Sequence, residues 1–519
     1  MKVDVQTDFS GGMCDPRRGM PAESYALAEN VRIDAGGLLA RRPLATFTEA
    51  LYEQQNLFWS VVDSAALGPF LFRIWRESGK LYLGGFVYTL ANHLEQVLHT
   101  KLPTLPYMPG GAYIEEEVIP GAAPGPLQYG SAVQIGQSLY AFLQFRDEYR
   151  IYSGAISRFW YLAEVPGIYL YRRGYAAPEC RASAYAFGRA WLAARASAET
   201  GYFYAAVSDR VDGDAPAPDL VFSEPPLAVD VRTSSDILGF CALGKEMIVF
   251  KRRSVWAVTG CDGEVSGMRV RAVSGEAGAV GPHAWTVADG ACWFVAGDGL
   301  YRIAPGGAAE RMTGDVAAFW RENVVFGTDE YPGVTLAVHG DTLLAGVPYG
   351  EDAPESGACN AFLAWSLPRR RLAGVWTGDG FGGWLLNYGS RGERPTFALS
   401  DAGEVEIHPA HVVSIEGAAH DDLRVTLKTR ELAEACGRHF CICVRVGLRN
   451  APDYDGALHG VSVSATVGDK TVTKTLTGAC GVLSFMIGRA AESLQVSIVA
   501  QGGFATIETV SVGYVPRPA

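Results

Sequence analysis

The chain repeats one short phrase at a spacing of about fifty residues. The phrase is a turn glycine, a run of apolar residues, a second short turn and another apolar strand, and it is clearest between Ile237 and Ile303. The turn glycines of the copies are Gly136, Gly188, Gly244, Gly290, Gly340 and Gly389, at spacings of 52, 56, 46, 50 and 49 residues. Short strands rich in Val, Ile, Trp, Tyr and Phe between such turns are typical of β-hairpins.

A period near fifty residues predicts a β-propeller. One four-stranded sheet of this length cannot bury both of its faces alone, so it has to pack against neighbouring copies in a closed ring. The spacing predicts about six such sheets, or blades, over residues 46–409, with a Pro- and Gly-rich insertion near residues 103–130. The alternative is a set of unrelated hairpins in two β-sandwiches.

The sequence changes character after about residue 410. Seven segments over the last hundred or so residues alternate apolar and polar residues almost strictly. This alternation is typical of antiparallel strands with one face in water. It predicts an all-β chain in which residues 410–519 form a β-sandwich-like domain appended to the propeller. Residues 1–45 are expected to form an N-terminal segment that closes the ring with a strand.

Charge and hydropathy limit the partners of this chain. It has 44 basic and 56 acidic residues and a net charge of −12, which disfavours a specific grip on phosphates but allows passive contact with DNA. No run of eighteen apolar residues occurs, and residues 1–19 lack the apolar core of a signal peptide. We therefore expect synthesis in a cytosol, no membrane insertion, and free thiols at the ten scattered cysteines.

No motif for catalysis or metal binding stands out. The sequence lacks G-x-S-x-G, HExxH and P-loop patterns, and the tightest Cys/His group lacks the second ligand pair that a zinc site would need. That group is Cys436, His439, Cys441 and Cys443. We expect no cofactor, no metal and no catalytic residue. A glycosidase carboxylate pair is defined by its separation in space, so the sequence leaves that class open as an alternative.

Two segments resemble one family of phage proteins. An N-terminal F-x-G-G, followed by A-x-N-V, G-x-L and R-P, is similar to the opening of tail hub or nozzle proteins of short-tailed bacteriophages, also called DNA-stabilisation or tail tubular proteins. The matching N-terminal residues are Phe9, Gly11, Gly12, Ala28, Asn30, Val31, Gly36 or Gly37, Leu38, Arg42 and Pro43. The matching central residues are Ile237, Leu238, Ile248 to Phe250, Ser254 to Trp256, Thr259, Gly260, Gly278, Gly281, Pro282, Asp298, Gly299 and Tyr301. Together the two segments cover about a hundred residues.

The resemblance implies a structural virion protein of the tail, made in the host cytoplasm, and not an enzyme. It implies a homo-oligomeric ring, six-fold, through which DNA passes without sequence-specific binding during genome ejection. The implied partners are the head–tail adaptor ring and the tail needle or fibre proteins. The residues expected to matter are structural: Asn30, Gly36, Gly37 and Pro43 in the N-terminal segment, and Gly244, Trp256, Pro282, Gly299 and Tyr301 in the blade framework. Two alternatives stay open, a propeller glycosidase or lyase that acts on a surface polysaccharide and a monomeric propeller that serves as an interaction platform.

Overall fold

The computed structural model is built almost entirely of β-strands. It describes residues 2–15, 20, 22–34, 37–40, 45–46, 55–64, 68–77, 80–88, 94–101, 127–136, 138–145, 149–158, 166–168, 171–172, 180–195, 203–211, 220–222, 227–229, 237–326, 333–354, 359–377, 385–387, 396–401, 409–414, 424–432, 439–450, 461–476, 480–491, 494–501 and 505–516. Within these ranges α1 (Ala317–Asn323) is the one α-helix, and short 3-10 helices lie at Val265–Gly267 and Thr313–Val316. The prediction of an all-β chain is confirmed. No helix of the described ranges is long and apolar enough to span a membrane.

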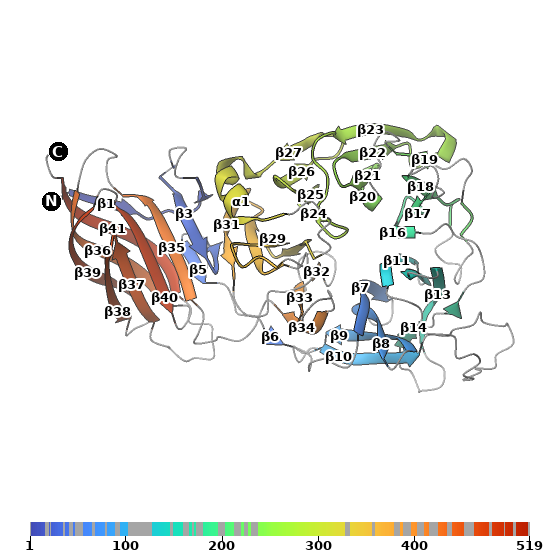
Figure 1. Ribbon diagram of the computed structural model, residues 1–519, viewed down its shortest axis with the longest axis horizontal. Coiled ribbons are helices and arrows are strands. Elements are labelled where there is room, and N and C mark those ends of the chain that lie inside the picture. Colours follow the sequence, from blue (N-terminus) through green and yellow to red (C-terminus); the bar gives the residue numbers. More distant parts are fainter. Residues whose placement is uncertain are drawn as a thin grey trace.

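Seven antiparallel sheets follow one another along the chain in the described ranges (Figure 1). The first sheet holds β7 (Gln55–Ser64), β8 (Gly68–Glu77), β9 (Lys80–Tyr88) and β10 (Leu94–Lys101). The second sheet holds β11 (Leu127–Ile135), β12 (Ser138–Phe145) and β13 (Tyr149–Arg158). Two short strands, β14 (Pro166–Ile168) and β15 (Tyr171–Arg172), both pair with β13. The third holds β16 (Cys180–Ala186), β17 (Arg189–Arg195), β18 (Phe203–Val207) and β19 (Leu227–Ala228), and the fourth β20 (Ile237–Leu243), β21 (Glu246–Lys251), β22 (Val255–Thr259) and β23 (Arg269–Ser274).

The remaining three sheets follow the same order. The fifth holds β24 (Trp285–Ala288), β25 (Ala291–Ala296), β26 (Gly299–Ile303) and β27 (Ala309–Arg311), and the sixth β28 (Thr335–His339), β29 (Thr342–Val347), β30 (Ala361–Ser366) and β31 (Arg371–Trp376). The seventh holds β32 (Leu385–Asn387), β33 (Thr396–Asp401) and β34 (Pro409–Ser414), and its fourth strand is β6 (Ala45–Thr46) from the N-terminal segment. A strand from the start of the chain thus completes the last sheet.

The first strands of the seven sheets contact one another in chain order. β7 contacts β11, and the contacts continue through β16, β20, β24 and β28 to β32, which contacts β7. Neighbouring first strands approach closely. The hydroxyl oxygens of Ser131 in β11 and Ser183 in β16, for example, are 2.6 Å apart. A Cβ on Gly239 in β20 would collide with the Trp285 ring in β24. Small residues at these positions therefore let the first strands of neighbouring sheets approach one another.

Glycines in the left-handed region make the turn between the first and second strands. Five of the six repeat glycines adopt this conformation, which an L side chain enters at a cost. They are Gly136 (φ 57°), Gly188 (φ 71°), Gly244 (φ 60°), Gly290 (φ 65°) and Gly340 (φ 55°). Gly389, the sixth, lies outside the described residues.

The described residues contain seven sheets of this type, one more than the repeat glycines predicted. The additional sheet is the first, β7–β10. Between β7 and β8 the sequence has Ala65, Ala66 and Leu67 in place of the turn glycine that marks the other copies. A count based on that glycine therefore missed it.

The two ends of the chain come together in two further sheets. Their N-terminal strands are β1 (Lys2–Gln6), β2 (Gly12–Met13), β3 (Ser24–Glu29), β4 (Val31–Asp34) and β5 (Gly37–Ala40). Their C-terminal strands are β35 (Arg424–Glu431), β36 (His439–Asn450), β37 (Val461–Val467), β38 (Lys470–Leu476), β39 (Cys480–Ala491), β40 (Gln495–Gln501) and β41 (Ala505–Pro516). The first terminal sheet has the order β39-β36-β41-β5-β4, with β1 paired to β41, and the second has the order β3-β35-β40-β37-β38.

One apolar cluster fills the space between the two terminal sheets. Val444 and Val512 enter it from the first sheet, and Leu427, Val463 and Ile498 from the second, all fully buried. The alternation in the sequence is visible in β35, where buried residues alternate with exposed or half-buried ones. β3 also pairs with β31, so the second terminal sheet is continuous with the sixth sheet.

Candidate functional site

Asn30 lies at the joint between the sixth sheet and the terminal sheets. Its backbone φ is 58°, in the left-handed region that asparagine tolerates better than most residues. The Asn30 N–H donates to the carbonyl of Val375 at 2.7 Å. Its amide group donates to the carbonyl of Arg424 at 2.9 Å and accepts from the Thr377 N–H at 2.9 Å. One residue thus satisfies backbone groups next to β31 and at the start of β35.

Two aromatic side chains fasten the same joint. The Tyr25 hydroxyl donates to the carbonyl of Ala373 in β31 at 2.6 Å, and the Trp376 indole donates to the carbonyl of Val31 in β4 at 2.7 Å. Tyr25 is completely buried, which raises the pKa of its hydroxyl far above the ordinary value. These bonds connect positions some 345 residues apart in the chain. The joint is therefore dry and held by specific polar contacts.

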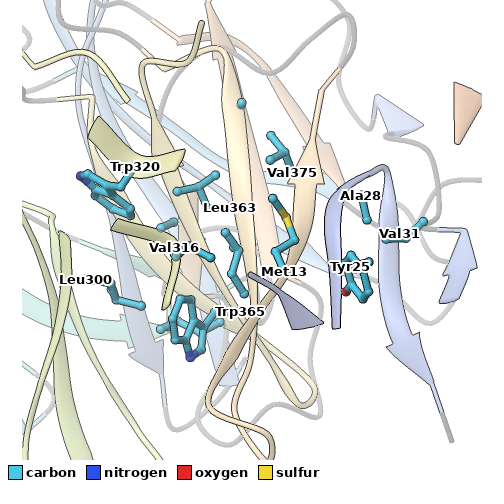
Figure 2. Close-up of a cluster of buried hydrophobic side chains, with 14 of the residues drawn as sticks. Met13, Tyr25, Ala28, Val31, Leu300, Val316, Trp320, Leu363, Trp365 and Val375 are labelled. Atoms are coloured by element: carbon cyan, nitrogen blue, oxygen red, sulfur yellow. The ribbon is translucent and has the colours of Figure 1, made fainter. Parts of the chain in front are cut away.

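The F-x-G-G motif packs into this joint. Phe9 is buried with its ring 6.3 Å from that of Tyr25. Gly12 has φ 70°, and a Cβ there would lie 2.7 Å from the carbonyl oxygen of Leu372 in β31. Figure 2 shows Met13 beside Val375 and Leu363 of the sixth sheet. The motif needs both glycines, because a Cβ on Gly12 would meet β31 and a Cβ on Gly11 would meet Glu23 and Ser24.

The fifth sheet reaches the joint through η3 (Thr313–Val316) and α1. The Asp15 N–H donates to the carbonyl of Asp315 at 2.9 Å, and the Asp315 carboxylate forms an ion pair with Arg371. Val316 and Trp320 lie in the same cluster as Leu363 and Trp365 (Figure 2). The N-terminal segment thus contacts the end of one sheet and the outer strand of the next.

The other predicted N-terminal residues are described only in part. Gly37 is the first residue of β5, which pairs with β4 along one edge and with β41 along the other. Gly36 and Pro43 lie outside the described residues. Leu38, which also carries the resemblance, is completely buried and pairs with Ile507.

The predicted blade residues lie in the fourth and fifth sheets. Gly244 makes the β20–β21 turn, and Pro282 is half-buried in the connection between β23 and β24. Trp256 in β22 is half-buried, and its indole donates to the Ser254 hydroxyl at 3.0 Å. Gly299 starts β26, where a Cβ would collide with the Thr313 hydroxyl.

Tyr301 completes this set. Its hydroxyl donates to the Asp298 carboxylate at 2.9 Å, and its ring stacks on Phe294 with centroids 5.2 Å apart. Burial first, and then the neighbouring Asp298, raises the pKa of Tyr301 to about 12. These contacts hold the turn between β25 and β26. They do not bring the blade residues next to Asn30.

Sequence reasoning missed three residues of the joint: Tyr25, Gly374 and Trp376. A Cβ on Gly374 would lie 2.9 Å from the carbonyl oxygen of Ala28, so that glycine permits the close crossing of β3 over β31. The only signal in the sequence is that glycine and an aromatic residue stand inside one apolar strand. Nothing in the sequence indicates which distant segment they meet.

The arrangement offers no metal site within the described ranges, where no group of three His, Cys, Asp or Glu side chains gathers. Cys441 is buried on the inner side of the first terminal sheet, and the ring of His439 meets Tyr514 edge-on at 5.3 Å. Cys443 follows a β-bulge in β36, and Cys436 lies outside the described residues. The zinc reading gains no support from this geometry.

Comparisons with known proteins add little to these observations. No protein-family model matches the chain, and no curated protein matches it significantly. It is similar to the extracellular domain of a one-component system from B. thetaiotaomicron, with a TM-score of 0.36 and 9% identity over 74% of this chain and 41% of that one. It is also similar to the GH32 β-fructofuranosidase of Bombyx mori, with a TM-score of 0.24 and 9% identity over 76% of this chain and 93% of the enzyme. The chain thus spans less than half of the first protein. TM-scores below 0.5 do not establish a shared fold, so the function has to be argued from the residues of this chain.

Proposed function

We propose that the seven sheets form a seven-bladed β-propeller and that the two terminal sheets form a β-sandwich attached to it. The support is the order of contacts, in which every first strand meets the next and β32 meets β7. A propeller needs its last blade tied to the start of the chain, and the pairing of β6 with β34 provides such a tie.

We further propose that the chain is a structural subunit of the tail hub or nozzle of a short-tailed bacteriophage. The observation that carries this proposal is the joint around Asn30. Residues of the N-terminal resemblance, among them Phe9, Gly12 and Asn30, take part in fastening the sandwich to the sixth blade, together with Tyr25 and Trp376. A subunit that transmits load between an adaptor ring and a needle or fibre benefits from two domains fixed to one another.

In this proposal the DNA conduit is the axis of a ring of subunits. The first strands of neighbouring blades approach closely at small residues such as Ser131, Ser183 and Gly239, and the conduit in this proposal does not run through the blades of one chain. Head-to-tail contacts between identical subunits close into a ring around a separate axis, and six subunits are expected. A net charge of −12 gives DNA few sites at which to stick as it passes.

The alternative function is a propeller glycosidase or lyase that acts on a surface polysaccharide. Such an enzyme needs two carboxylates about 5–10 Å apart around the bond that is cut. Six of the seven first strands, β11 to β32, contain no Asp or Glu, and β7 contains one, Asp63, so the first strands do not supply a pair of carboxylates to the axial region. This composition favours the structural proposal.

The two functions predict different behaviour of the purified chain. We expect light scattering coupled to size exclusion, together with electron microscopy, to give annular particles of about six subunits at high protein concentration. We also expect no release of reducing ends from host surface polysaccharide. A monomer at every concentration that releases reducing ends would replace the hub proposal with the enzyme.

A further inference from the structure

Among the residues whose side-chain burial the structure describes, the exposed apolar ones are concentrated on one sheet. Eight large hydrophobic side chains of this set are exposed, and five of them belong to the first terminal sheet. These are Val3 (58%), Val5 (47%), Val482 (66%), Met486 (66%) and Val515 (40%). Isolated exposed apolar residues are ordinary, but several of them on one face of a sheet mark an interaction surface. Here Val482 and Met486 lie on β39 and Val3 and Val5 on β1, with β36 and β41 between the two groups.

The strand register places four of these side chains on one face. Met486 pairs with Cys443, Cys443 with Gly513, and Gly513 with Val3, which makes one row across β39, β36, β41 and β1. Directly paired residues point to the same side of a sheet. The next row is Ser484, Arg445, Ser511 and Val5, and the third contains Val482, Gly447 and Thr509. Val515 shares the face because it lies two residues after Gly513. We call this face the valine face.

The outer face of the second terminal sheet is different. Its cross-strand pairs Ser464–Thr473 and Thr466–Thr471 are joined by hydroxyl contacts of 2.7 and 2.8 Å, and these residues are exposed or half-buried. Serine and threonine are what a solvated strand surface carries. The apolar composition of the valine face is therefore a local property and not a general one of these strands.

Arg445 lies in the middle of the valine face. It is exposed, and within the described residues it forms no ion pair. Its neighbours in its row, Ser484 and Ser511, are small and uncharged. Met486 and Val482 lie diagonally from it on β39, and Val5 lies in its row beyond Ser511. A partner that covers the apolar side chains has to offer a carboxylate here, since an arginine buried without one costs several kcal/mol.

The acidic residues of the chain are in excess outside the C-terminal strands, so a second copy of the chain can supply the carboxylate that Arg445 needs. Residues 421–519 contain ten Lys and Arg against nine Asp and Glu, and residues 1–45 contain six of each sign. Of the total of −12, this leaves a net charge of −13 for residues 46–420. A symmetric contact centred on the valine face would bring two Arg445 guanidinium groups together. A head-to-tail contact sets Arg445 against the acidic remainder of the neighbouring copy, and head-to-tail contacts are the kind that close into rings.

We infer that the valine face is the subunit contact of the ring and that it binds the acidic propeller portion, within residues 46–420, of a second copy of this chain. The inference rests on the proposed ring function and names the partner surface for it. Val482 and Met486 provide the apolar contact, and Arg445 selects a carboxylate and so fixes the direction of assembly.

The test combines association measurements with crosslinking of the full chain. In light scattering, Val482→Asp and Met486→Asp are each expected to raise the concentration at half assembly by about tenfold or more, and Arg445→Glu to do the same. The matched control is Thr473→Asp, which adds the same charge to the outer face of the second terminal sheet and is expected to assemble like the wild type. Circular dichroism and the monomer radius verify that each variant is folded.

Crosslinking identifies the partner surface directly. An Arg445→Lys variant, mixed with ¹⁵N-labelled wild-type chain and treated with a carbodiimide, is expected to give an isotopically mixed crosslink from position 445 to a carboxylate within residues 46–420. Rings that persist in Val482→Asp and Met486→Asp, or crosslinks from position 445 only to residues 1–45 or 421–519, would overturn the inference and leave the ring function standing. Wild-type chain that stays monomeric at every concentration would overturn both.

Discussion

At the residue scale, Asn30 shows how one side chain can hold two parts of a chain together. It combines a left-handed backbone with three hydrogen bonds to backbone groups at the joint. Glycine would accept the conformation but would supply neither side-chain bond. Alanine would lack both advantages.

We expect Asn30→Ala to lower the free energy of unfolding by about 2–3 kcal/mol, because it loses two hydrogen bonds and strains the backbone. Asn30→Gly should cost about 1–2 kcal/mol, since only the hydrogen bonds are lost. Urea unfolding of the three proteins measures both values. Equal losses for the two variants would show that the backbone conformation contributes nothing.

Tyr301 gives a prediction about pH. Its pKa in the folded chain is about 12, above the ordinary value of 10.0, so the folded chain keeps the hydroxyl proton to higher pH than the unfolded chain does. The contribution of Tyr301 to stability is therefore complete below pH 10 and declines between pH 10 and 12. In Tyr301→Phe that part of the decline should vanish. The measurement is the difference in unfolding free energy between wild type and variant from pH 8 to 12, and a constant difference would contradict the shift.

At the scale of elements, the repeat glycines and the packing glycines have separate roles. Gly290 has φ 65° and open space around it, so it serves the turn alone. Gly278 lies against the backbone of Lys251, where a Cβ would collide with the carbonyl. A tryptophan also stabilises two of these hairpins. The Trp293 indole donates a hydrogen bond to the carbonyl of Ala288 at 3.1 Å in the β24–β25 hairpin, and the Trp191 indole donates to the carbonyl of Ala186 at 3.2 Å in the β16–β17 hairpin.

We therefore expect Gly278→Ala to cost about 3 kcal/mol, because backbone has to move, and Gly290→Ala to cost only about 1 kcal/mol from the strained φ. Both are single methyl additions, one in the connection from β23 to β24 and one in the β24–β25 turn, so each is the control for the other. Thermal unfolding followed by circular dichroism gives the order. A larger loss for Gly290→Ala would mean that the conformation of the turn contributes more to stability than the close packing of Gly278 against Lys251.

At the scale of the whole molecule, the joint couples the terminal sheets to the sixth sheet. β3 is paired to β35 on one side and to β31 on the other, so neither sheet can open at this edge without exposing the other. Removing one bond of the joint should therefore weaken both sheets together.

Tyr25→Phe tests this coupling, since it removes only the hydroxyl that donates to Ala373. We expect amide hydrogen exchange to accelerate in peptides from both β31 and β35, in proportion to a loss of about 1–2 kcal/mol. Peptides from β12 in the second sheet, far along the chain from the joint, provide the unchanged reference. Acceleration confined to β31 would show that the two sheets open independently.

The sequence by itself determined the strands, the turns and the repeat. Period-two alternation and left-handed glycines act over a few residues, so patterns such as those around Gly188 and Gly244 are legible without a structure. The same locality explains the missed first sheet, whose turn lacks the glycine. Asn30 was found through a motif, whereas its partners Val375, Thr377 and Arg424 were not.

Only the tertiary structure decided which distant segments meet. Neither the pairing of β6 with β34 nor the crossing of β3 over β31 has a signature in the sequence, because backbone hydrogen bonds are the same at every residue. The valine face is a further case, since alternation along β39 tells that Val482 and Met486 share a side but not that Val3 and Arg445 lie beside them. That neighbourhood depends on register, which is fixed when the two ends of the chain close on one buried core.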